Sequence, residues 1–438
     1  TRDDDRFLFL QLFAAAQDVF YVSYQGADPR DGSAREPSVL VTELLAAAAA
    51  QHVGSEAAED LVVQHPLQPF APAAFGAGDD ARRFSYRAQW WPAASAPATQ
   101  RQALGPWFDG APLAPVDVED TLSLDTLRRF LQAPAEVFLR QRLGLRLADV
   151  DAVDSDVEPL GVPGRGLGRH ALQRAVFDAR VRGEDDATTQ ALLRARGLLP
   201  SGPLGRRTLD AVRREVDDYA ERFRAWREDA SADTPRLDVD LDVPGAGPVR
   251  LHGRLADVYP QGIARVRIGA PNGNSTIRDG LDWLLAAAAG LHIPMVQFED
   301  RGELGKGPHE RPFIPADQAR DALTRLIALR AQGLQAPLVF APYSSWEYYQ
   351  AAPDIEKGLK KAAEKWFGTG IGLAESLKEP LRLALRGRDP FVNEATRREF
   401  VDHSMAIFLA VAAGQRYDGT DADALRDVAA GLDMEDAE

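Results

Sequence analysis

The chain has 438 residues, more than one domain usually contains, and 45% of them are hydrophobic and 27% charged, as in soluble globular proteins. It has no cysteine, which excludes disulfides, zinc–thiolate sites, iron–sulfur clusters and cysteine nucleophiles in this sequence. The formal net charge of −15 argues against DNA binding over the whole surface, so any DNA contact must come from a local basic patch.

The sequence also predicts a chain without a membrane segment. No stretch approaches the roughly 20 apolar residues that cross a bilayer, and the N-terminal residues show no signal-peptide pattern. Together with the missing cysteines, this favours the cytoplasm. Residues 1–5, Thr-Arg-Asp-Asp-Asp, contain no methionine and are interpreted as the start of a piece cut from a larger protein.

Residues 1–91 are predicted to form an α/β unit. Residues 6–17 have helical apolar spacing, and residues 19–23 are apolar and β-branched or aromatic, as in a short strand. A turn-rich loop follows from residue 25 to residue 33. Ser38 is predicted to cap a second helix that continues to Leu45.

Residues 92–118 are predicted to be a linker, because residues 92–115 contain five prolines among Ala, Ser and Gly. The second domain is expected at residues 119–417. It should begin with a helix capped by Ser123, which Pro134 ends while opening the next helix. Residues 418–438 hold eight acidic residues and one arginine and are predicted to be a solvated tail.

The middle of the second domain is predicted to be rich in strands. Residues 237–243 alternate between apolar residues and aspartates, as in a half-buried strand. Residues 249–258 and 263–268 are predicted as two further strands joined by a turn. Beyond them the apolar spacing predicts two helices and then a buried strand at 338–340. The apolar positions are Ile277, Leu281, Leu284, Leu285 and Ala288 in the first helix, and Leu323, Leu326 and Ile327 in the second.

The first unit resembles the last motif of superfamily-one helicases, in which a helix ending in Thr-Arg-Ala-Arg precedes a strand. The resemblance lies in residues 6–26 and in Pro37-Ser-Val-Leu-Val-Thr-Glu-Leu-Leu45. The positions of the helicase arginines, which reach nucleotide phosphates, are occupied here by Ala14, Ala15, Ala16 and Gln17. The resemblance therefore implies the end of a 2A-type helicase-like domain without ATPase function.

The second domain resembles the nuclease domains of the RecB and AddB group, which have the PD-(D/E)XK fold. Those domains carry a Gly-Arg-Ile-Asp strand and then an Asp-Tyr-Lys strand, whose aspartates hold Mg²⁺. Here the matching residues are Gly253-Arg-Leu-Ala256-Asp257-Val258 and Arg265-Val-Arg267, so both metal carboxylates are missing. Asp257 is one residue out of register, and His170 lies near the position of a site histidine.

Taken in order, these matches are similar to the RecC family, the gamma chains of exodeoxyribonuclease V. The resemblance implies a non-catalytic scaffold and DNA-handling subunit of a RecBCD helicase–nuclease in recombinational repair of double-strand breaks. It implies RecB-like and RecD-like partner subunits, double-stranded DNA ends and unwound single strands as ligands, and no membrane contact. ATP and Mg²⁺ are expected only in the partner subunits, with no catalytic, cofactor or metal residue in this chain.

Six residues are candidate DNA contacts. Arg254, Arg265 and Arg267 lie at the altered nuclease motifs, where guanidinium groups would repel Mg²⁺ and attract phosphate. They could equally pair with neighbouring aspartates or face water. Tyr24, Arg30 and Arg35 belong to the loop of the helicase-like unit, for which an ordinary surface turn is the alternative.

Three other charged clusters are interpreted as surface features. Asp238, Asp240 and Asp242 lie on one strand face at spacings too long for one compact metal shell. Residues 154–158 resemble half of a calcium loop without its glycine and closing glutamate. A lysine-rich helix around residues 357–365 is predicted to be solvated, with phosphate or partner contact as the alternative, and Trp366 and Phe367 could be core or interface.

Two functional alternatives remain open. One is an active Mg²⁺-dependent nuclease with displaced ligands, which would need carboxylates such as Asp257 to converge beside the strands at 249–268. The other is a protein-interaction module that does not contact DNA. The surroundings of Ala256, Arg265 and His170 distinguish these readings.

Overall fold

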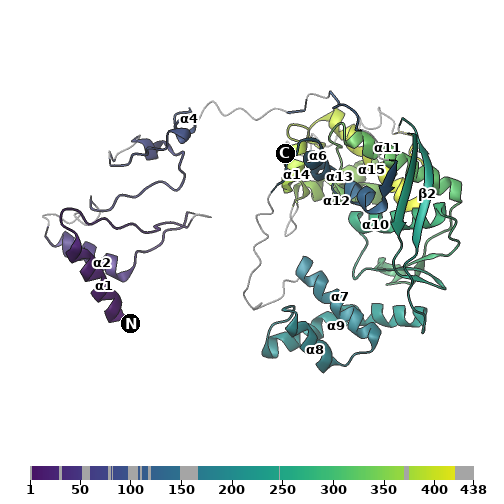
Figure 1. Cartoon of the computed structure of the whole chain (residues 1–438), viewed down its shortest axis with the longest axis horizontal. Helices are drawn as coiled ribbons and strands as arrows, with labels where there is room; N and C mark the ends of the chain where they lie inside the picture. The colour runs from purple at the N-terminus through teal and green to yellow at the C-terminus, as the bar shows by residue number, and fades with distance from the viewer. Residues whose placement is uncertain are drawn as a thin grey trace. The chain divides into compact units, whose positions relative to one another are not determined.

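The computed structural model describes residues 2–28, 32–51, 60–76, 80, 82–96, 107–108, 111–116, 120–147, 166–245, 247–368 and 374–419. The chain divides into two units, Thr1–Ala103 and Leu104–Glu438 (Figure 1), and each is described by itself. Among the described residues, no helix combines the length and the apolar character that crossing a bilayer requires.

The first unit consists of short helices: α1 (Arg2–Ala15), α2 (Val39–Ala49), the 3-10 helices η1 (Pro72–Phe75) and η2 (Ala88–Trp90), and α4 (Trp91–Ala94). The strand predicted at residues 19–23 does not form. Val19 and Tyr21 are about four-fifths exposed, and the described part of this unit supplies only an isolated bridge between Ala27 and Ala34. A strand needs a neighbour for its backbone hydrogen bonds, and this segment has none there.

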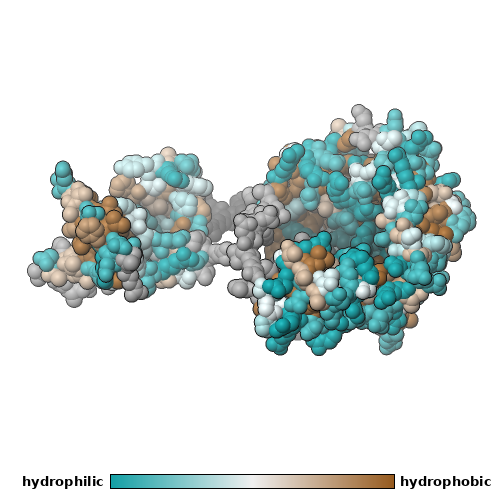
Figure 2. All heavy atoms as spheres, turned by 60° about the horizontal axis from the view of Figure 1, so that its bottom comes forward, coloured by the Kyte–Doolittle hydropathy of each residue, from teal (hydrophilic) through white to brown (hydrophobic). Residues whose placement is uncertain are grey.

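Apolar side chains lie on the surface of the first unit, as the brown atoms in Figure 2 show. Among its described residues, Ala94 is the only apolar side chain that is buried. The large exposed ones include several on α1: Phe7, Leu8, Leu10, Leu12 and Phe13. The described part of this unit therefore has no hydrophobic core of its own.

Two described residues of the predicted linker, Trp107 and Leu113, contact the rest of the second unit. The Trp107 indole Nε1 donates to the Leu383 carbonyl oxygen at 2.6 Å, and the Leu113 amide donates to the Gln335 carbonyl oxygen at 2.8 Å. The side chain of Trp107 also packs against an apolar cluster of the second unit. Proline content alone does not predict these contacts, because an extended proline-containing segment can pack on a domain or remain a free linker.

The second unit holds two small sheets. Their strands are β1 (Thr121–Ser123), β2 (Arg236–Val243), β3 (Gly247–Arg254), β4 (Val258–Tyr259), β5 (Gly262–Val266), β6 (Met295–Phe298) and β7 (His309–Glu310). The first sheet has the order β1-β3-β2, with β1 parallel and β2 antiparallel to β3. The second has the order β4-β5-β6-β7, in which only β5 and β6 are parallel.

Helices surround these sheets. They are α5 (Leu124–Gln132), α6 (Pro134–Arg142), α7 (Leu167–Arg182), α8 (Asp186–Ala195), α9 (Gly202–Arg227), α10 (Gly273–Ala288), the 3-10 helix η4 (Gly302–Leu304), α11 (Ala316–Gly333), α12 (Pro342–Ala351), α13 (Ile355–Phe367), the 3-10 helix η5 (Glu375–Leu377), α14 (Glu379–Ala384) and α15 (Glu394–Ala413). Figure 1 shows α7, α8 and α9 grouped together at one side of the unit. The unit is thus a mixed α/β structure.

Several of these elements confirm the sequence predictions. The Ser123 hydroxyl accepts from the Thr126 amide at the start of α5, and Pro134 is the first residue of α6. In β2 the aspartates face solvent, whereas Val239, Leu241 and Val243 are buried. The alternation of a half-buried strand was therefore a sufficient signal at this position.

Two predicted strands were wrong in extent or type. Residues 249–258 do not form one strand, because Asp257 has a φ of 56° and interrupts the pleat, so β3 and β4 belong to different sheets. Residues 338–340 are buried but are not paired as a strand. A short apolar run reports burial, and it does not distinguish a paired strand from a packed extended segment.

Helix α10 is the central element of the second unit. Asn272 and Ser275 form a capping box at its N-terminus, and the helix packs against α5, α11, α12 and α15. At Gly280 the backbones of α10 and α15 approach closely, since a Cβ atom there would collide with the Val411 carbonyl oxygen. Most of α10 is buried, including the charged residues Asp279 and Asp282, which lie among apolar side chains.

Candidate functional site

The segment from β3 to β5 contains the two motifs that the sequence singles out. Ala256 lies in the link between β3 and β4, and its carbonyl oxygen accepts a hydrogen bond from Arg265 Nη1 at 2.9 Å. The Asp257 carbonyl oxygen accepts from the Ala264 amide at 2.9 Å. Arg265 on β5 therefore lies directly beside the position at which the resemblance expects a metal-binding carboxylate.

Arg265 is an interior residue. Its side chain is 8% exposed, and its Nη2 lies 2.6 Å from Asp282 Oδ2 on α10. Its Nη1 also donates to the Ala264 carbonyl oxygen at 2.7 Å. The expectation that Arg265 contacts DNA is corrected by this arrangement, because a phosphate could reach the guanidinium only by displacing these buried partners.

Two further arginines extend this buried pair into an ion-pair cluster, in which Arg278 and Asp125 at the edge are partly and largely exposed. Arg128 Nη2 on α5 lies 2.6 Å from the second oxygen of Asp282, and Arg128 also pairs with Asp125. Arg278 Nε lies 2.7 Å from Asp279 Oδ1. The members of this cluster, three cations and three anions, are Arg128, Arg265, Arg278, Asp125, Asp279 and Asp282.

The cluster does not fit a divalent metal. Each of its two buried carboxylates is already engaged by a guanidinium group, and the formal charges of the cluster sum to zero. A Mg²⁺ ion needs free carboxylate oxygens and a net negative environment. In the described part of the chain, no three His, Asp or Glu side chains lie together as metal ligands would.

The sequence analysis missed Asp279, Asp282 and Arg278. Their signal was present, because charged side chains recur inside an apolar helical stretch that also contains Ile277, Leu281 and Leu284. Asp279 and Asp282 are three residues apart and therefore share one face of α10. Only the fold shows that this face meets Arg265 of β5.

A group of basic side chains lies beside this cluster, in a pocket of about 250 Å³. His170 and Arg174 of α7 line it together with Arg278 of α10 and Arg267, which follows β5. The sequence singled out His170 and Arg267 separately, and the structure brings them together. No aspartate or glutamate is among the described residues that line this pocket.

The electrostatics of Arg267 and Arg278 differ. Burial lowers the pKa of Arg267, and the nearby Arg278 lowers it further. Burial also opposes the charge on Arg278, but its ion pair with Asp279 outweighs this and raises its pKa. The Arg267 Nε donates to the Ala270 carbonyl oxygen at 2.6 Å, and no ion pair with a carboxylate forms at Arg267 within the described residues.

The other predicted DNA contacts lie elsewhere. Arg254 is exposed at the end of β3, directly opposite Arg236 of β2. In the first unit Tyr24 is exposed, whereas Arg35 pairs with Asp28 and donates to Gln25 Oε1 at 3.2 Å. Arg30 lies outside the described residues. Within the second unit, the structure therefore places Arg254, Arg265 and Arg267 in three different surroundings.

The aspartate row on β2 is exposed, as the sequence predicted, and Arg250 Nε lies 2.8 Å from Asp240 Oδ1. This pairing lowers the pKa of Asp240. Residues 154–158, the half calcium loop, lie outside the described residues. On α13 the lysines are exposed, Trp366 is buried in the core and Phe367 is exposed.

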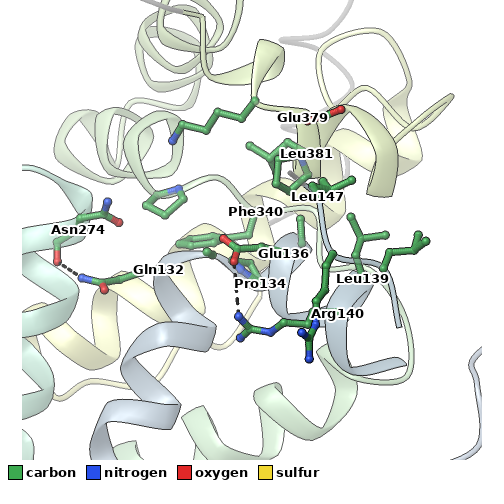
Figure 3. Close-up of a pocket in the computed structure, with 17 residues that line it drawn as sticks. Gln132, Pro134, Glu136, Leu139, Arg140, Leu147, Asn274, Phe340, Glu379 and Leu381 are labelled. Carbon is green, nitrogen blue, oxygen red and sulfur yellow. Dashed lines mark hydrogen bonds and ion pairs between the residues drawn. The ribbon is translucent and has the colours of Figure 1, made fainter. Parts of the chain in front are cut away.

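A larger pocket of about 1040 Å³ lies where α5, α6 and the N-terminus of α10 meet (Figure 3). Its wall combines apolar side chains such as Phe340 with the ion pair between Glu136 and Arg140, whose atoms are 3.7 Å apart. Gln132 Nε2 donates to the Asn274 carbonyl oxygen at 2.9 Å across this wall. Its lining combines basic side chains (Arg140, Arg146 and Lys378) with acidic ones (Glu136 and Glu379).

Comparisons with known proteins agree on one family. The model of the RecC C-terminal domain matches residues 119–353. The curated relatives include the RecBCD enzyme subunit RecC of Escherichia coli, 30% identical over 81% of this chain and 31% of that protein. The RecBCD enzyme subunits RecC of Mycolicibacterium smegmatis and Mycobacterium tuberculosis are 28% and 29% identical over 90% and 83% of this chain.

The chain spans about a third of the length of these curated relatives. The family model covers more than half of the chain, including β1 to β7 and the whole ion-pair cluster around Arg265. The chain belongs to the RecC family.

Proposed function

We propose that this chain is part of a non-catalytic RecC subunit, which holds DNA and partner subunits in a RecBCD-type helicase–nuclease acting in recombinational repair. The relatives are named as RecBCD enzyme subunits, which supports RecB-like and RecD-like partners for this chain. The proposal places the complex at double-stranded DNA ends and their unwound strands, in the cytoplasm. ATP and Mg²⁺ then act in the partner subunits and not here.

One observation carries the non-catalytic part of this proposal. The Arg265 guanidinium donates to the Ala256 carbonyl oxygen and pairs with Asp282, so a fixed positive group lies where the resemblance expects the metal. A guanidinium held in this way repels a divalent cation and uses the carboxylates that a metal would need. The altered centre therefore has a structural role.

The fold supports a nuclease-like description of the second unit. Ala256 lies just before β4, which a two-residue turn joins to β5 with Arg265, and the Ala256 carbonyl oxygen accepts from Arg265, so the paired motifs of the resemblance lie side by side. The buried helix α10 and the parallel strand β6 then follow in the chain. The helicase-like description of the first unit rests on the motif at residues 6–45, and α1 and α2 are the helices that it predicts.

The proposal keeps Arg267 and Arg254 as DNA contacts, with Tyr24, Arg30 and Arg35 as contacts from the first unit. Arg267 and Arg254 are the arginines of the altered motifs that are not held in the buried cluster. Arg254 on β3 lies opposite Arg236 on β2, and such like charges repel. Asp238 Oδ1 lies 3.5 Å from Arg236 Nη2, whereas Arg254 forms no ion pair with an anion among the described residues. A phosphate backbone would supply such an anion.

A nuclease assay tests the non-catalytic part. The purified chain is incubated with linear duplex DNA and Mg²⁺ or Mn²⁺, and we expect no metal-dependent cleavage above that of a chain treated with EDTA. The variant Ala256→Asp should also be inactive, because Arg265 still occupies the centre. Cleavage that disappears in Asp257→Ala would instead establish a nuclease with displaced ligands.

The exposed apolar side chains of α1 favour a second candidate function, a protein-interaction module that does not contact DNA. Co-purification with RecB-like and RecD-like subunits is expected under both candidates. Binding of the chain to forked DNA separates them, because phosphate contacts make the affinity fall with salt concentration. A chain that joins the complex but shows no salt-dependent DNA binding would support the interaction module.

A further inference from the structure

The pocket lined by His170, Arg174, Arg267 and Arg278 has the features of a binding site for an anionic ligand. Four basic side chains from α7, α10 and the end of β5 line it, and none of its described lining residues is acidic. Such a concentration is unusual in a chain with a net charge of −15. Like charges gathered in a concave site repel each other unless an anion joins them.

Solvent reaches the pocket through its arginines. The side chains of Arg174 and Arg278 are 58% and 43% exposed, although each has one carboxylate partner outside the pocket lining. Arg174 pairs with Asp178 at 3.1 Å, and Arg278 pairs with Asp279 at 2.7 Å. A guanidinium group has five N–H donors, so both arginines keep donors for a second anion.

Arg267 differs from these two arginines. Its Nε donates to the Ala270 carbonyl oxygen, and in the part of the chain that the structure describes it forms no ion pair with a carboxylate. Burial and the neighbouring Arg278 lower its pKa, so its charge is disfavoured by its surroundings within this chain. An external anion between Arg267 and Arg278 would compensate both charges.

The pocket also contains an unsatisfied acceptor. Gln173 is 9% exposed, and its Nε2 donates to Glu215 Oε2 at 2.8 Å. The other atom of the amide, Oε1, is buried without a hydrogen-bond partner among the described residues. A ligand with an anionic group and a nearby N–H donor would therefore match the pocket better than a simple anion, and a nucleotide has both.

We infer that this pocket binds a backbone phosphate of a DNA strand, with Arg267 and Arg278 donating to the phosphate oxygens and His170 and Arg174 beside them. The inference rests on the proposed DNA-handling function and specifies where the strand is held. The pocket adjoins the buried cluster through Arg278, which pairs with Asp279 of that cluster. The altered nuclease centre thus binds a phosphodiester beside a site that cannot cleave it.

The test measures the binding of the full chain to fluorescently labelled forked DNA over a range of salt concentrations. The logarithm of the affinity falls as the logarithm of the salt concentration rises. We expect Arg267→Gln and Arg278→Gln each to make this fall less steep by roughly one unit of slope. Arg267→Lys should retain most of the slope, because it keeps the charge. Arg250→Gln is the matched control, because it removes an exposed arginine of β3 that is paired with Asp240 of β2. The salt dependence of this variant should equal that of the unaltered chain.

The outcomes separate this inference from the proposed function. Circular dichroism first shows that both Gln variants are folded. If their DNA binding has the same salt dependence as the unaltered chain, the pocket is not a phosphate site, whereas the proposed DNA-handling function remains. If the chain does not bind forked DNA, inorganic phosphate and a mononucleotide are tested by thermal shift. Stabilisation that is lost in Arg267→Gln would support a phosphate site for a free ligand, and no stabilisation would overturn the site altogether.

Discussion

Arg265 Nη2 and Asp282 Oδ2 lie 2.6 Å apart, and both side chains are 8% exposed. The other oxygen of Asp282 lies 2.6 Å from Arg128 Nη2, so one carboxylate joins β5, α5 and α10. A buried ion pair is costly to desolvate, and its partners depend on each other for compensation. This pair therefore holds the altered centre together as part of the core.

Removing the Arg265 charge should destabilise the second unit. In Arg265→Met, Asp282 keeps Arg128 but loses its second partner, and the Ala256 carbonyl oxygen loses its donor. We expect the free energy of unfolding to fall by about 2–4 kcal/mol in urea denaturation. Arg250→Met, which removes an exposed ion pair, should leave the midpoint unchanged. Equal effects of the two variants would contradict a structural role for Arg265.

The contact of α10 with α15 predicts a strong effect at Gly280. An alanine Cβ atom there would collide with the Val411 carbonyl oxygen, so the two helices would have to separate. We expect Gly280→Ala to lower the free energy of unfolding by about 1–3 kcal/mol or more. Gly168→Ala on α7 is the control, because nothing lies near a Cβ atom at that position and alanine favours a helix. A neutral Gly280→Ala would show that the helix pair adjusts freely.

The segment around Trp107 should contribute to the stability of the second unit. Trp107 packs on the apolar cluster and donates to the Leu383 carbonyl oxygen, so Trp107→Ala removes both contacts. We expect a loss of about 2 kcal/mol, seen as a lower denaturation midpoint. Trp91→Ala removes a half-exposed tryptophan of the first unit and should leave the unfolding of the second unit unaltered. An unchanged midpoint in Trp107→Ala would identify residues 107–113 as a free linker.

The half-buried His403 predicts that the stability of the second unit depends on pH. Burial lowers the pKa of His403 below its ordinary value of 6.5, although its hydrogen bond with the Val339 carbonyl oxygen opposes this. The unfolded chain therefore takes up a proton near pH 6.5 that the folded chain does not, and the free energy of unfolding falls as the pH decreases through that value. His403→Asn should flatten this dependence between about pH 7 and pH 5, whereas His292→Asn, at an exposed histidine, should retain it. Identical pH profiles for the two variants would contradict the assignment to His403.

Local sequence signals predicted many of the individual elements. The helix capped by Ser123, the proline that opens α6 and the alternation along β2 are set by residues close together in the chain, and the structure confirms them. The strand predicted at residues 19–23 was wrong because pairing depends on a neighbour that no local pattern reports. The break at Asp257 likewise depends on a backbone conformation, with positive φ, that the residue type does not predict.

The candidate site shows the same division between local and tertiary information. Residue identity alone shows that Ala256 carries no carboxylate and that positions 265 and 267 carry arginines. Only the fold shows that Arg265 is buried against Asp282, while Arg267 lies in an open basic pocket with His170 and Arg278. The physical reason is that the free energy of a charge depends on its burial and on its partners, and here those partners come from helices and strands that are distant in the chain.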